Sequence, residues 1–148
     1  MQIQQVNRVD AEKVFILIKN VDGGGSITTG MGAQLTQLAA SFDGISSVRS
    51  VAALYNGFMG IAVQDIAINA FGLVQNWGYC ASVQISGVGT SITVTAGDYL
   101  KPGAVAGTMF SSITDQAMST LLYRVSYAGA SQTISANPVW VSAVVFGL

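Results

Sequence analysis

The sequence contains no histidine and a single cysteine, Cys80. An intrachain disulfide therefore cannot form, and neither a Cys–His pair nor a histidine metal ligand is available. The chain also lacks the G-x-S-x-G turn that exposes a nucleophilic serine and the D-x-[DN]-x-[DN]-G loop that binds calcium. The sequence thus predicts no catalytic, cofactor-binding or metal-binding residue, and it predicts Cys80 to be a small core residue.

Charge is also scarce. Charged residues make up 9% of the chain, against roughly 25% in typical soluble proteins, and the net charge is −1. A protein that binds nucleic acid through its phosphates needs clustered Lys and Arg, so we expect no nucleic-acid partner. A charge-poor surface predicts instead that part of it is covered by copies of the chain or by a larger assembly. A polar surface of Ser, Thr, Gln and Asn is the alternative.

The mean hydropathy of +0.53 raises the question of a membrane. The longest charge-free run, residues 66–97, is interrupted by Asn, Gln and Ser side chains and by glycines. A membrane-spanning helix needs about 20 predominantly apolar residues, and the N-terminal residues MQIQQVNRVDAEK lack the apolar core of a signal peptide. We therefore expect no membrane partner and no export by the usual route.

The chain holds 17 glycines, whereas proline occurs only at 102 and 138. Between the glycines, short runs rich in Val, Ile, Thr and aromatic residues predict strands separated by turns. The predicted strands are residues 13–21, 58–63, 79–86, 91–96, 122–128 and 139–146. The first of them, KVFILIKNV, is nearly continuously apolar through Ile18, which predicts that both of its faces are covered.

Alternation within two of these runs predicts which side chains face inward. In residues 79–86 these are Tyr79, Ala81, Val83 and Ile85. In residues 91–96 they are Ile92, Val94 and Ala96, and residues 87–90 are predicted to join the two strands as a hairpin. Two segments have helical character: residues 112–115 form an S-x-x-D capping box followed by apolar residues at helical spacing, and residues 34–40 are a weaker case.

These elements predict a mainly-β fold, a single small β-barrel or β-sandwich with at most one short helix. The predicted domain spans residues 1–148, with its core in residues 13–148 and an N-terminal arm in residues 1–12. The end strand before Leu148 is a second candidate arm. An extended arm can add a strand to the sheet edge of a neighbour, and a frayed terminus is the alternative interpretation.

The glycine-rich stretch DGGGSITTGMG, residues 22–32, has the spacing of a phosphate-binding loop between Gly25 and Gly30. Such a loop needs G-x-x-x-x-G-K-[ST], in which the lysine neutralises phosphate charge, and Met31 stands where the lysine belongs. We therefore expect glycine turns on a surface loop or short edge hairpin, with a short strand at Ser26–Thr29.

Two further groups of residues are candidate sites. Acid–base chemistry would require Asp65 and Asp98 to meet in space, because the closest acidic pair in sequence, Asp10 and Glu12, lies near the terminus. Each of Asp65 and Asp98 is expected instead to end a strand or to shape a turn. The aromatic residues could line a sugar-binding face or anchor an interface, although packing in the core is favoured for most of them. These residues are Phe58, Phe71, Trp77, Tyr79 and Trp140.

Residues 58–79 read FMGIAVQDIAINAFGLVQNWGY. They resemble a phrase of the capsid decoration, or cement, proteins of tailed bacteriophages: F-x-G-I-A-x-x-D-I-A, then F/Y-G-x-V-Q-x-x-G. Residues 14–32 are similar to the opening of the same family, residues 97–100 to its G-D-x-L turn, and residues 138–141 are a looser match. The likeness runs from about residue 14 to residue 105, and these turn-and-strand phrases supply no functional residue to transfer.

The resemblance implies a non-enzymatic virion structural protein that decorates or cements a capsid by binding across capsomer joints. Its partners would be the major capsid protein and other copies of itself, with a trimer as the first guess and no small-molecule substrate. It would be made in the bacterial cytoplasm and reside on the capsid surface. The alternatives are another virion component, such as a tail, fibre or head–tail joining protein, or a carbohydrate-binding β-domain that uses Trp77, Tyr79 or Trp140.

Overall fold

The computed structural model describes residues 12–36, 44–51, 57–86, 92–95, 97–102, 106–107, 109–111, 124–127, 132–134 and 139–146. These residues form strands, turns and a closed five-stranded β-barrel, with no α-helix, which confirms the mainly-β prediction. Within the same ranges no helix is long and apolar enough to cross a membrane.

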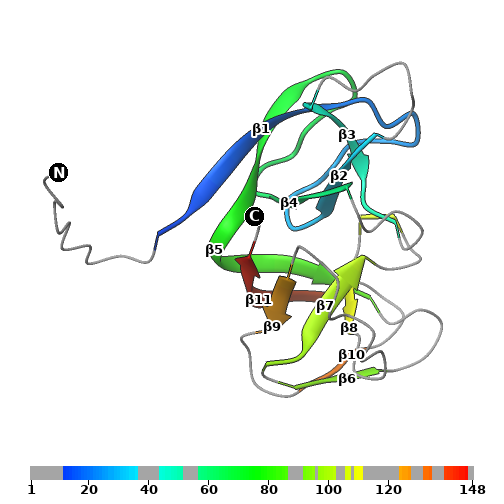
Figure 1. Cartoon of the computed structure of the whole chain (residues 1–148). Coiled ribbons are helices and arrows are strands. Elements are labelled where there is room, and N and C mark those ends of the chain that lie inside the picture. The colour runs from blue at the N-terminus through cyan, green and yellow to red at the C-terminus, as the bar shows by residue number, and fades with distance from the viewer. Residues whose placement is uncertain are drawn as a thin grey trace, which may run out of the picture.

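The described residues form eleven strands in chain order (Figure 1). They are β1 (Val14–Asn20), β2 (Gly32–Leu35), β3 (Ser46–Arg49), β4 (Phe58–Ala62), β5 (Phe71–Ile85), β6 (Ile92–Val94), β7 (Tyr99–Pro102), β8 (Met109–Ser111), β9 (Arg124–Tyr127), β10 (Gln132–Ile134) and β11 (Val139–Phe146).

The barrel consists of β1, β3, β2, β4 and β5 in that order, and it closes because β1 also pairs with β5. The closing pair is antiparallel and runs from Val14 opposite Trp77 to Lys19 opposite Phe71. Strand β1 pairs with β3 only at Lys19 and Asn20, so among the described strands Val14–Ile18 pair with β5 alone. The barrel can therefore meet a partner through this strand edge as well as through its side-chain faces, its ends and its loops.

A second circuit of hydrogen-bonded strands, here called the second ring, is formed by β5, β11, β9, β7 and β8. Strand β11 lies antiparallel to the second half of β5, and the ring closes through one parallel pair, Ile85 with Met109. Strands β10 and β6 form a separate two-stranded sheet. Figure 1 shows the barrel and the second ring as two lobes joined by β5.

Strand β5 belongs to both circuits and turns a corner between them (Figure 1). Its pairing with β1 skips Asn76, and its pairing with β11 places Ser142 opposite both Ala81 and Ser82. Extra residues of this kind are β-bulges, which bend a strand and increase its twist. The bulges therefore allow one strand of 15 residues to form part of both the barrel and the second ring.

Buried amides hold this bend. The Gln75 side-chain amide donates hydrogen bonds to the carbonyl oxygens of Trp77, at 3.1 Å, and Tyr79, at 3.0 Å. The Asn76 amide donates to the Met59 carbonyl of β4 at 2.9 Å. Both amides lie in the interior of the protein, where unpaired polar groups are costly. Gln75 and Asn76 thus satisfy backbone groups where β5 bends.

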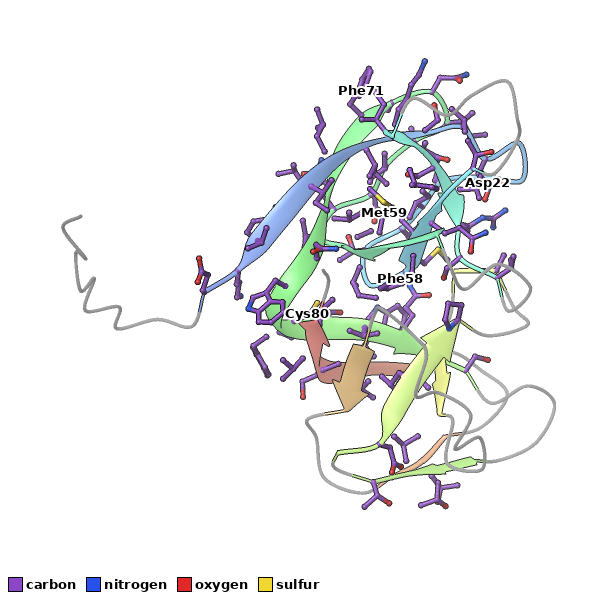
Figure 2. All side chains as sticks on the ribbon, in the orientation of Figure 1. Asp22, Phe58, Met59, Phe71 and Cys80 are labelled. Carbon is purple, nitrogen blue, oxygen red and sulfur yellow. The ribbon has the colours of Figure 1, made fainter. Side chains whose placement is uncertain are left out.

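Each circuit has its own hydrophobic core (Figure 2). The barrel core contains Ile18, Ile27, Ala33, Ala62, Ile66 and Val74. The second core contains Phe58, Ile61, Cys80, Val83, Ile85, Val94, Leu100, Val141, Ala143 and Val145. Strand β4 contributes to both, because Ala62 packs into the first core while Phe58 and Ile61 pack into the second. The two cores therefore lie against opposite faces of one strand.

Several predicted strands agree with the structure. Residues 13–21, 58–63 and 139–146 correspond to β1, β4 and β11, while residues 91–96 and 122–128 contain β6 and β9. Strand β5 begins at Phe71, well before the predicted start at residue 79, because the glycines in FGLVQNWGY lie within the strand and do not end it. The predicted capping box at residues 112–115, the hairpin turn at residues 87–90 and most of the predicted arm (residues 1–11) lie outside the described residues.

Two local predictions were wrong. Residues 34–40 were a weak helical candidate, but Gln34 and Leu35 belong to β2. The strands of residues 79–86 and 91–96 were expected to form a hairpin, but among the described residues β6 pairs with β10 and not with β5. In both cases long-range strand pairing overrides a weak local signal.

The inward face predicted for residues 79–86 was half wrong. Tyr79 and Ala81 are exposed and Cys80 is buried, whereas Val83 and Ile85 are buried as predicted. The bulge at Ala81–Ser82 lies at the point where the pattern reverses. An inserted residue moves every later side chain to the other face of the strand, and alternation alone does not reveal it.

The backbone at Gly78, where β5 bends, predicts a large effect of substitution. Its φ is 94°, and a Cβ atom at this position would overlap the carbonyl oxygen of Glu12. We expect Gly78→Ala to lower the free energy of unfolding by about 3 kcal/mol or more, because backbone strain of about 1–3 kcal/mol adds to the steric overlap. Urea denaturation measures this loss.

The matched control is Gly97→Ala. Gly97 has a similar φ of 90°, but nothing lies within 4 Å of the added Cβ. This variant should show the backbone strain alone, about 1–2 kcal/mol. Equal losses for the two variants would contradict the role given to the Gly78–Glu12 approach.

Candidate interaction surface

The first half of the glycine-rich stretch is tied to the barrel by Asn20 at the end of β1. The Asn20 amide nitrogen donates to the carbonyl oxygens of Ile66, at 2.9 Å, and Gly25, at 3.1 Å. Its amide oxygen accepts the backbone N–H of Asp22 at 2.9 Å. Because Asn20 is fully buried, its amide groups need these partners. The three hydrogen bonds determine the position of residues 22–25 after the end of β1.

The Asp22 carboxylate organises the loop itself (Figure 2). It accepts hydrogen bonds from the Gly24 backbone N–H at 2.7 Å and from the Arg49 side-chain Nε at 2.7 Å. A Cβ atom on Gly24 would overlap the tip of the Arg49 side chain, so the small residue makes room for the ion pair. The basic group beside the loop is therefore already engaged by a carboxylate of the same loop.

This arrangement lowers the pKa of Asp22. Burial alone would raise the pKa, but the hydrogen bonds from Arg49 and Gly24, together with the charge of Arg49, lower it below its ordinary value of 3.8. The carboxylate thus stays ionised at neutral pH and acts as a structural clamp between the loop and β3.

The second half of the stretch is partly buried, with Ile27, Gly30 and Gly32 inside the protein. Ile27 forms an isolated bridge with Ile66 instead of the predicted short strand. The Gly30 N–H donates to the Ala62 carbonyl at 2.8 Å, and the Gly30 carbonyl accepts the N–H of Gln84 at 2.8 Å. The expected surface loop is therefore confirmed for residues 22–26 and wrong for residues 27–32, which pass between β4 and the second half of β5.

Asp98 shapes a turn, as expected, whereas Asp65 links its loop to the glycine-rich stretch. Asp65 accepts hydrogen bonds from the N–H of Thr29 at 2.7 Å and from its hydroxyl at 2.9 Å, and these bonds lower the pKa of Asp65. Asp98 accepts the N–H of Thr95 at 2.6 Å. Glu12 lies just before β1, and Asp10 lies outside the described residues. In the part of the chain that the structure describes, no group of three or more Cys, Asp or Glu side chains could hold a metal ion.

Cys80 is a core residue, as predicted. It is a free cysteine, 5% exposed, and packs in the second core. Burial raises the pKa of its thiol, which disfavours the reactive thiolate. The side chain therefore serves packing.

The aromatic residues depart from their predicted burial. Phe58 is buried in the second core, as expected. Phe71 is 55% exposed, Trp77 40%, Tyr79 42% and Trp140 60%, so the expectation that most of the candidate aromatics pack in the core was wrong. In β5 the residues next to these rings, Gly72, Gly78 and Cys80, are buried.

Four exposed apolar side chains of β1 and β5 share one face, here called the outer ribbon face: Phe15, Leu17, Phe71 and Leu73. Leu17 lies opposite Leu73, and Phe71 lies opposite Lys19 on the same side of β1. Val14, Trp77 and Tyr79 are also exposed, but they lie beyond the bulge at Asn76, on the other face of the two strands. At one end the Lys19 ammonium lies 5.8 Å from the ring centre of Phe71, within cation–π range.

The outer ribbon face corrects the prediction that both faces of residues 13–21 are covered. Ile18 is buried in the barrel core and Ile16 packs against it, but Phe15 and Leu17 are about half exposed. Within a single chain, β1 therefore has one covered face and one open face. Its continuously apolar sequence is the signal that could have indicated a surface of this kind.

Comparison with known proteins identifies no relative. No protein-family model matches the chain, and no curated protein matches its sequence. The function must therefore be argued from the side chains themselves.

The Asp22 clamp predicts a pH-dependent stability. The pKa of Asp22 is lower in the folded chain than in the unfolded chain, so its stabilisation is present above the ordinary pKa of 3.8 and is lost as the pH falls through the folded-state value. We expect Asp22→Asn to cost about 1–2 kcal/mol at neutral pH, since it removes a charge-assisted hydrogen bond, and the difference from wild type to shrink in acid. Urea titrations at neutral pH and in acid measure it.

Arg49→Gln provides the control. In the double variant, Asp22→Asn should cost much less than in the wild-type background, because the ion pair is already broken. A cost of Asp22→Asn that is the same at every pH and in both backgrounds would show that Asp22 does not act as a charged clamp.

Proposed function

We propose that the chain is a non-enzymatic structural protein of a virion, which decorates or cements a bacteriophage capsid by binding across capsomer joints. In this proposal its partners are the major capsid protein and other copies of the chain, with three copies as the first guess. It is made in the host cytoplasm and resides on the outside of the capsid.

The outer ribbon face is the observation that carries this proposal. The largest contiguous apolar patch on a soluble monomer is often functional, and aromatic side chains are enriched where proteins bind one another. The low charge supports the same conclusion, because a chain with 9% charged residues offers few charges to keep it dispersed.

The acidic side chains support a structural role. Asp22, Asp65 and Asp98 each accept backbone N–H groups in turns, so their carboxylates hold local structure. A cement protein acts by burying surface repeatedly over a shell, and an interface of standard size buries about 1,600 Å². A rigid β-fold with an apolar face suits that task.

The direct test is co-sedimentation with expanded, undecorated capsids of the phage that encodes the chain. We expect the purified chain to pellet with the capsids at a fixed number of copies per particle. Because the binding surface is charge-poor, raising the salt from about 0.1 M to 0.5 M should change the bound fraction little, since salt weakens charge-driven contacts.

An unrelated soluble protein of similar mass is the control for trapping in the pellet. If the chain stays in the supernatant at micromolar concentrations under both salt conditions, the capsid proposal is wrong. Binding that is restricted to tails or fibres would support the other virion roles instead.

A carbohydrate-binding role is the second candidate, because Trp77, Tyr79 and Trp140 are exposed. An exposed ring offers an apolar face on which a sugar can stack. This hypothesis predicts binding on a glycan array and protection of an indole from acrylamide quenching by the bound sugar. An array without binders, together with quenching that no sugar reduces, would remove it.

A further inference from the structure

The first half of β1 presents an unpaired backbone edge, because it extends away from β3 (Figure 1). Strand β3 pairs only with Lys19 and Asn20, so among the described strands Val14–Ile18 pair with β5 alone. The N–H and C=O groups along such an edge are a template for another strand. An extended polypeptide is the partner that can satisfy a row of alternating donors and acceptors.

The direction of the backbone groups along β1 follows from its pairing with β3. The Lys19 N–H donates at 2.8 Å to the carbonyl oxygen of Ile45, just before β3. In a strand, successive residues direct their N–H and C=O groups to opposite sides. The backbone groups of Phe15 and Leu17 therefore point the same way as those of Lys19, away from β5 and toward the open edge.

The pairing with β5 agrees with this direction. Leu73 lies opposite Leu17, but its carbonyl oxygen accepts the N–H of Val63 at 3.3 Å, on the other side of β5. Leu17 and Leu73 thus form a non-hydrogen-bonded pair. Leu17 keeps both backbone groups for the open edge, and Phe15, two residues earlier, does the same.

The open edge lacks the features that protect edge strands from pairing. Natural proteins place charged residues, proline or a bulge on such an edge. Residues 14–18 read VFILI, with no charge and no proline, and the extra residue of the bulge between β1 and β5 lies in β5. β-Branched and aromatic side chains favour an extended strand. The edge is therefore suited to pairing with a further strand.

A second copy of the chain fits this edge in one register. Two β1 edges related by a two-fold axis run antiparallel, and the outward-pointing residues of one must face those of the other. When Phe15 faces Phe15 of the second copy, Leu17 faces the second copy's Lys13. A shift of two residues toward β3 would place Lys13 opposite Lys19, which is a like charge whose N–H is already bound to Ile45.

We propose that two copies of the chain associate by antiparallel pairing of their β1 edges around a two-fold axis at Phe15. This inference rests on the proposed function in taking the chain to be a homo-oligomer, and it replaces the first guess of three copies with two. The pair is closed, because each copy covers the same edge of the other. Opposed residues of antiparallel strands project to the same side, so the two outer ribbon faces form one apolar surface toward the capsid.

Charge substitutions at the axis test both the edge and the register, by light scattering coupled to gel filtration over a dilution series. We expect the wild-type chain at about 100 μM to have twice the mass of 15.3 kDa. Phe15→Lys and Phe15→Glu should each raise the dissociation constant about 10-fold or more, because like charges then face each other across the axis. An equimolar mixture of the two variants should restore association, since opposite charges then face each other.

Leu73→Lys and Leu73→Glu are the matched controls. Leu73 lies on the outer ribbon face, but in a strand whose backbone is bonded on both sides. These variants should keep the wild-type dissociation constant, alone or mixed. Far-UV circular dichroism checks that each variant is folded. If the Phe15 and Leu73 variants weaken association equally and mixing restores neither, copies meet through the apolar face and edge pairing is wrong.

Amide hydrogen exchange measures the alternation along the edge. In the wild-type chain at about 100 μM, the Leu17 N–H should exchange about 10-fold or more slowly than in Phe15→Lys, because it is bonded only in the pair. The N–H groups of Ile16 and Ile18 point to β5 and should be equally protected in both proteins. A Leu17 N–H that exchanges at the same rate in both would overturn the proposal.

A wild-type chain that stays monomeric at about 100 μM would overturn the association itself. That result leaves the capsid proposal to be judged by co-sedimentation, in which a monomer can still bind. Protection of Leu17 that appears only on capsids would assign the edge to a capsid strand and would also overturn self-pairing. A dimer that forms through β1 but never pellets with capsids would support the inference and remove the proposed function.

Discussion

Strand β5 is shared by two closed circuits of hydrogen bonds, and the other features of the structure depend on this sharing. Its first half completes the barrel with β1 and β4, and its second half opens the second ring with β11. A strand can change partners in this way only by bending. The bulged residues, the positive φ of Gly78 and the buried amides of Gln75 and Asn76 all lie at that bend, where they relieve steric contacts and satisfy carbonyl groups.

The bend also determines which side chains reach solvent. Strand β5 places Val74 in the barrel core and Cys80 in the second core, and Gln75 and Asn76 between them are both buried at the bulge. Phe71 and Leu73 therefore share an outer surface with Phe15 and Leu17 of β1, whereas Trp77 and Tyr79 are exposed on the other face of the strand. The same geometry that closes two small cores leaves an apolar face open, and this face is where we expect partners to bind.

The sequence predicts the mainly-β fold and several strands because short apolar runs between glycines are a strong local signal. Val139–Phe146 begins and ends at the predicted residues. The exposure of Tyr79 could not be predicted, since a bulge reverses the inward face and leaves no mark on the alternation. Nor could β1 be seen to pair with both β3 and β5, because barrel closure depends on contacts between residues far apart in the chain.

The candidate surface was only partly accessible to sequence reasoning. The low charge indicated a covered surface, and the rings of Trp77, Tyr79 and Trp140 were recognised as possible contacts, but burial in the core was favoured for most aromatic residues. Met31 stands where a phosphate-binding loop has its lysine, so the sequence predicts that the glycine-rich stretch is not such a loop. The sequence did not show that Asp22 of this loop forms an ion pair with Arg49 of β3.

The central claim is that this apolar face lies between protein subunits on a capsid. The most direct measurement is an electron-microscopy reconstruction of expanded capsids incubated with the chain. The account predicts added density over the capsomer joints, with β1 and β5 turned toward neighbouring copies and away from solvent. Bound density in which the outer ribbon face points into solvent, or particles with no added density, would contradict it.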